Sequence, residues 1–77
     1  MGHSGRNSNG LSEQQSVGVF NDYLVTRFGV NKFNELELGN PYLQYGDWMA
    51  CLKEDGKVIN RLRINRKQDQ KVTIHPA

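Results

Sequence analysis

The side chains that most often carry catalysis or bind metals are few in this 77-residue sequence, and they lie far apart. Cys51 is the only cysteine, and the two histidines, His3 and His75, stand near opposite ends. A catalytic thiolate needs a base beside it, and a structural zinc ion needs four nitrogen or sulfur ligands. Since no histidine is close to Cys51 in the sequence, we predict a protein that is not an enzyme and that holds no metal and no cofactor.

Basic side chains are the one charged group that is concentrated in part of the sequence. Residues 1–52 hold three Lys or Arg against five Asp or Glu, a net charge of −2, whereas residues 53–77 hold seven against three, a net charge of +4. This asymmetry indicates an acidic or phosphate-bearing partner for the C-terminal part. The alternative is a solvated strand whose Lys and Arg discourage edge pairing.

Most of these basic residues fall in a predicted β-hairpin over 47–66, in which Asp55-Gly56 marks the turn. A two-residue loop would place arginines on one face with apolar side chains. A three-residue loop over 54–56 separates the two kinds, and a slip of one residue would reverse every side chain. We therefore predict the three-residue loop, which pairs Leu52 with Val58, Ala50 with Asn60 and Trp48 with Leu62.

The same register leaves an opposite, outer face of the hairpin with an apolar middle and a basic flank. Burying a large apolar side chain contributes about 1.5–3 kcal/mol before the costs of association are subtracted. We therefore predict that this face binds a partner. Apart from Cys51, which we interpret as a small apolar residue, its members are the predicted binding residues: Met49, Lys53, Lys57, Ile59, Arg61 and Arg63.

A helix is predicted over 12–28, before the hairpin. Ser12 can cap the first turn while Gln15 reaches back to it. Four apolar residues then recur with the period of one helix face, namely Val17, Phe20, Leu24 and Phe28. Gly29 suits the left-handed residue that ends many helices.

The remaining segments are less strongly patterned. Residues 30–38 fit a short helical turn or a half-buried strand, and we favour the helical turn. Residues 42–45 are an unusually apolar connector that we expect to lie on the edge of the core. A third strand is predicted over 71–75, with Ile64 facing Ile74 across a loop at 68–70.

These elements predict an α+β fold in two layers, with one N-terminal helix packed on a three-stranded antiparallel meander. Residues 11–77 form this single small domain. Residues 1–10 are expected to be a flexible tail, because Gly, Ser and Asn bury too little surface to offset the entropy of ordering.

The predicted function is a non-catalytic interaction module, such as an accessory or regulatory factor, that docks a protein partner or a second copy of itself through the outer face. The alternative is RNA or single-stranded DNA bound by the basic strand 57–67, for which this register offers no aromatic platform on that face. A third possibility is that residues 30–45 cover the face. No apolar run reaches the ~20 residues that cross a membrane, so no membrane partner is expected. The lone cysteine fits a reducing, cytoplasmic location.

Overall fold

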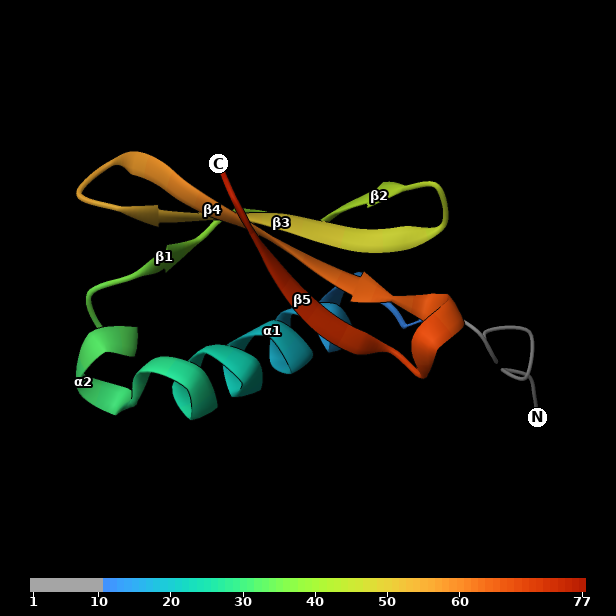
Figure 1. Ribbon diagram of the computed structural model, residues 1–77, viewed down its shortest axis with the longest axis horizontal. Helices are drawn as coiled ribbons and strands as arrows, with labels where there is room; N and C mark the ends of the chain where they lie inside the picture. The colour runs from blue at the N-terminus through green and yellow to red at the C-terminus, as the bar shows by residue number, and fades with distance from the viewer. Residues whose placement is uncertain (1–10) are drawn as a thin grey trace.

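The computed structural model describes residues 11–77, so the tail predicted over 1–10 lies outside the described residues. The strands form one antiparallel sheet, and both helices lie on the same side of it (Figure 1). In chain order the elements are α1 (Glu13–Phe28), α2 (Val30–Phe33), β1 (Glu37–Leu38), β2 (Tyr42–Gln44), β3 (Asp47–Glu54), β4 (Lys57–Asn65), the 3-10 turn η1 (Arg66–Gln68) and β5 (Lys71–Pro76).

The sheet is larger than the predicted meander. Strands β3, β4 and β5 do follow one another as neighbours, but β1 and β2 add two short strands along the other edge of β3. The α+β class is therefore confirmed, and the limit of three strands is wrong.

Helix α1 begins at the predicted capping box. The Ser12 hydroxyl accepts a hydrogen bond of 3.0 Å from the Gln15 backbone N–H, and the Gln15 side chain accepts one of 2.8 Å from the Ser12 backbone N–H. Gly29, with φ of +87°, follows the last helical residue. Phe20 and Leu24 are buried against the sheet residues that form the rest of the core: Ala50, Leu52, Leu62 and Ile64.

The turn between β3 and β4 has two central residues, not three. Asp55 and Gly56 both have positive φ, 53° and 77°, as a type I′ turn requires and as an Asp-Gly pair favours. Glu54 therefore pairs with Lys57. A β-bulge next to Leu52 then shifts the ladder by one residue, and the resulting pairs are Leu52 with Asn60, Ala50 with Leu62 and Trp48 with Ile64.

This pairing differs from the predicted register by two positions along most of the hairpin, and a shift of two leaves each side chain on its predicted face. Trp48 accordingly lies on the inner side, where its indole N–H donates a hydrogen bond of 2.7 Å to the Leu11 carbonyl. The last strand shows the same offset, because Ile64 pairs with Val72 and not with Ile74. The five-residue connection that contains η1 accounts for that difference.

Two predicted members of the outer face are displaced by the bulge. Ile59 has no partner in the ladder, since Asn60 pairs with Leu52 and Val58 pairs with Lys53, and its side chain packs against the buried core. Lys57 shares the face of its partner Glu54, whose carboxylate binds Lys32 of α2 at 2.5 Å. That hydrogen bond raises the pKa of Lys32. The prediction that Ile59 and Lys57 lie on the outer face is therefore wrong.

We expect Ile59→Ala to lower the free energy of unfolding by about 1–2 kcal/mol, roughly half the cost for a fully buried isoleucine, because Ile59 is half-buried against the core. Urea denaturation followed by circular dichroism measures the change. Val58→Ala is the matched control, since Val58 is its neighbour and 41% exposed. Equal losses of stability for the two variants would show that Ile59 does not pack against the core.

Segment 30–45 contains a helical turn and two strands in succession. The predicted helical turn occurs as α2, and the strand alternative occurs a few residues later as β1. The connector 42–45 was predicted to lie on the edge of the core, and this prediction is wrong. It forms strand β2 and a tight turn, with Leu43 60% and Tyr45 88% exposed.

Candidate functional site

The outer face of the sheet is the side opposite to α1 and α2, and within the part of the chain that the structure describes no helix lies on it (Figure 1). Segment 30–45 does not wrap over the face as the third possibility expected: Phe33 and Leu36 pack against the buried core, and Tyr42 reaches the face only as the strand partner of Met49. Segment 30–45 instead extends the edge of the sheet. The outer face is therefore a regular surface that the described helices leave uncovered.

Paired residues of an antiparallel sheet project to the same side, so the ladder defines the composition of this face. One row crosses four strands as Tyr42, Met49, Arg63 and Thr73. The next row consists of Cys51, Arg61 and His75, and a third row consists of Glu37, Lys53 and Val58. Rows along a strand are about 7 Å apart, two residues of 3.4 Å each. The outer face thus comprises these ten residues, with Gln44, Asp47, Asn65 and Lys71 at its other end.

Four of the six predicted binding residues lie on the outer face: Met49, Lys53, Arg61 and Arg63. The prediction missed further members, which include Tyr42, Thr73 and His75. The alternation of β5 contained the signal for Thr73 and His75, because Val72 and Ile74 were predicted to face inward. Tyr42 gave no such signal, since its position follows from the pairing of β2 with β3.

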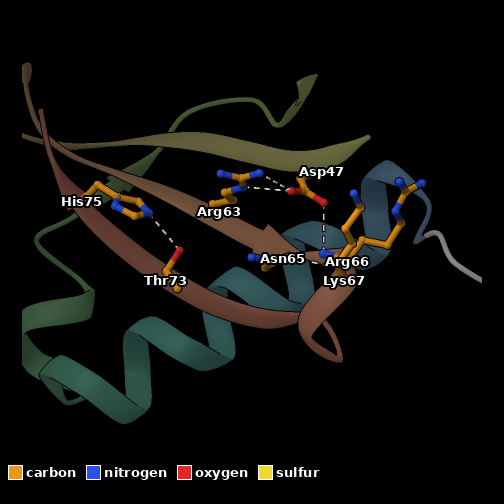
Figure 2. Close-up of polar contacts among 7 residues, drawn as sticks. All are labelled: Asp47, Arg63, Asn65, Arg66, Lys67, Thr73 and His75. Carbon is orange, nitrogen blue, oxygen red and sulfur yellow. Dashed lines mark hydrogen bonds and ion pairs between the residues drawn. The ribbon is translucent and has the colours of Figure 1, made fainter. Parts of the chain in front are cut away.

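Arg63 is held in place by a buried carboxylate at the end of the face. Its Nε and Nη2 contact Oδ2 of Asp47 at 2.8 and 2.6 Å, and the Arg66 backbone N–H donates to Oδ1 at 3.0 Å. Figure 2 shows Arg63 and Arg66 on either side of Asp47. Burial alone would raise the pKa of Asp47, but these hydrogen bonds outweigh it and lower the pKa below its ordinary value. The guanidinium is consequently fixed and largely neutralised.

Thr73 and His75 form a second polar pair on β5. The Thr73 hydroxyl and the His75 Nε2 are 2.9 Å apart (Figure 2), and the two residues face Arg63 and Arg61 respectively. The Asn60 amide donates a bond of 3.1 Å to the His75 carbonyl and ties β5 to β4. This part of the face therefore presents a ring, a hydroxyl and two guanidinium groups together.

Most cations on or near this face have no carboxylate partner. Within residues 11–77 the only Lys and Arg with a carboxylate oxygen inside 4.0 Å are Lys32 and Arg63. The cations that are left are Lys53, Arg61 and Lys71 on the face, Arg66 and Lys67 beyond its Asp47 end, and Arg27 and Lys57 elsewhere. Five of these seven cations thus lie on the outer face or beyond its Asp47 end.

The described residues offer no second kind of site. No group of three or more His, Cys, Asp or Glu among them is placed to hold a metal ion, and none of their helices has the length and apolar character to cross a membrane. Comparisons of the chain with protein-family models, with curated proteins and with solved structures give no match. The function is therefore inferred from the outer face.

Proposed function

We propose that this chain is a non-catalytic module that binds single-stranded nucleic acid on the outer face of its sheet. The observation that carries the proposal is the row in which Tyr42, 41% exposed, stands in register with Met49 and Arg63. An exposed ring on an open sheet, near Arg61 and Lys53, which have no carboxylate partner within residues 11–77, is the combination that stacks bases and neutralises phosphates.

Two differences from the predicted register favour nucleic acid over a protein partner or a second copy. The middle of the face loses Ile59 to the core and keeps half-buried Met49 and Cys51, while the apolar Val58 joins the face only at its turn end, as the partner of Lys53. The face gains Tyr42, the aromatic platform that the nucleic-acid hypothesis lacked. His75 adds a second ring beside Arg61.

A single strand suits this face better than a duplex. Stacking on a protein ring requires an unpaired base, whose edges are also free for hydrogen bonds. Thr73 and His75 supply a hydroxyl and an imidazole for those bonds, while Arg61 and Lys53 have no carboxylate partner within residues 11–77. A paired duplex would present its phosphates to the cations but leave Tyr42 without a base to stack on.

The proposal is tested by fluorescence anisotropy with labelled single-stranded DNA and RNA and with a duplex, at several salt concentrations. We expect single strands to bind more tightly than the duplex, with log K falling by about 0.7 per phosphate contact for each unit of log salt. Tyr42→Ala is expected to weaken binding about 5- to 100-fold, equivalent to about 1–3 kcal/mol per stacked base. Arg61→Ala is expected to reduce the salt slope by about 0.7.

Two variants serve as controls. Tyr42→Phe keeps the ring and is expected to bind like wild type. Arg27→Ala removes an exposed cation from α1, on the other side of the sheet, and is expected to leave the salt slope unchanged. Equal effects of the two arginine substitutions would contradict a defined site. A dimer that ignores every oligonucleotide would support the protein-docking hypothesis instead.

A further inference from the structure

The turn between β2 and β3 carries an aromatic residue that the fold itself does not favour. Tyr45 is 88% exposed and has φ of 54°, and Gly46 beside it has φ of 83°. Positive φ at both positions suits Asn-Gly or Gly-Gly, whereas a bulky residue in this conformation is strained. Residues held in such strained conformations cluster at functional sites. Neither packing nor turn geometry accounts for a tyrosine here.

The same turn has a guanidinium group packed against it. A Cβ placed on Gly46 would lie 3.0 Å from Nη2 and 3.1 Å from Cζ of Arg66, so the Arg66 side chain lies over the glycine. The backbone that carries Arg66 is held by Asp47, and the next N–H, of Lys67, is held by the Asn65 side chain at 3.1 Å. The backbone of both cations is thus held by hydrogen bonds, and the Arg66 side chain lies against the turn that carries the exposed Tyr45.

This turn is continuous with the outer face. Asp47 bonds the outer-face residue Arg63 with one oxygen and the Arg66 backbone with the other (Figure 2). Tyr45 lies three residues beyond Tyr42 on the same hairpin, about 10 Å along an extended chain. A single strand of nucleic acid that stacks on Tyr42 and continues past this end of the sheet would reach the turn with Tyr45 and the segment with Arg66 and Lys67.

We propose that the β2–β3 turn, with Tyr45, Arg66 and Lys67, is a second contact site for the same single strand, in which the ring stacks a base and the cations bind phosphates. This inference rests on the proposed function. It adds that the bound strand leaves the sheet at the Asp47 end, so that affinity depends on oligonucleotide length.

The test compares oligonucleotides of about 4 and about 12 nucleotides, within the range of site sizes of single-strand-binding domains. Tyr45→Asn is the decisive variant, because asparagine suits the positive φ and removes the ring. We expect its melting temperature to equal or exceed that of wild type, while its affinity for the longer oligonucleotide falls about 5- to 100-fold. The loss for the shorter one is expected to be smaller. Tyr45→Phe is the control that keeps both ring and affinity.

The outcomes separate the inference from the proposed function. If no oligonucleotide binds to wild type, both fail. If Tyr42→Ala weakens binding while Tyr45→Asn binds the longer oligonucleotide as wild type does, only the second contact site is overturned. A drop in affinity for Tyr45→Asn without a drop in melting temperature supports it, since a merely structural role for Tyr45 predicts the opposite pair of results.

Discussion

Phe20→Ala is expected to lower the free energy of unfolding by about 3–5 kcal/mol, because it empties the centre of a small core. Phe20 is 0% exposed and packs from α1 onto the buried residues of β3 and β4. A chain of 77 residues has a total stability of roughly 4–12 kcal/mol. The variant should therefore lose a large fraction of its stability, which urea titrations followed by circular dichroism would measure.

Two other apolar residues of the helical region calibrate this result. Phe28→Ala should cost less than Phe20→Ala, because Phe28 is only half-buried at the end of α1. Val30→Ala should change stability by less than about 0.5 kcal/mol, since Val30 is 59% exposed. If Phe20→Ala and Phe28→Ala cost the same, the core is not centred where α1 crosses the sheet.

The faces of the sheet could be predicted from the sequence better than its pairing. Side chains alternate along a strand, so an error of register changes the face of a side chain only when the shift is an odd number of residues. Separating apolar from charged residues around Gly56 gave the right parity, and Trp48 and Ala50 lie inward as predicted. The pairs themselves were wrong by two positions, an error that the alternation cannot detect.

The bulge explains why the predicted site was only partly right. The sequence pattern distinguishes only a two-residue turn from a three-residue turn, whereas the chain combines a two-residue turn with a β-bulge. Between the turn and the bulge, the residues of β4 lie on the face opposite to the predicted one. Beyond the bulge they lie on the predicted face. Lys57 and Ile59 lie in that reversed stretch, and no local pattern marks it.

The short strands could not be predicted because their partner is distant in the sequence. Glu37–Leu38 and Tyr42–Gln44 have too few residues for a period, and they become strands because β3 offers a free edge. The position of Tyr42 on the outer face depends on that pairing. The residue that carries the proposed function was for this reason absent from the predicted site.

Asp47→Asn is the second substitution with a large expected effect, a loss of about 2–3 kcal/mol at neutral pH. Asp47 is 5% exposed, and its two oxygens accept hydrogen bonds from the Arg63 guanidinium and the Arg66 backbone. A neutral amide keeps the shape but leaves Arg63 without its counter-charge. Asp69→Asn, at an exposed position on the loop after η1, is the control and should be close to neutral.

The same carboxylate makes stability depend on pH in a predictable direction. The hydrogen bonds of Asp47 lower its pKa in the folded state, whereas in the unfolded chain the group titrates near its ordinary value of about 3.9. Its contribution is therefore complete above about pH 4 and is lost as the pH falls through the lower, folded pKa. Urea titrations of wild type and Asp47→Asn should show a stability difference that is constant near neutrality and shrinks in acid. Parallel pH profiles for the two proteins would mean that the carboxylate is not ionised in the folded state or not bonded as described.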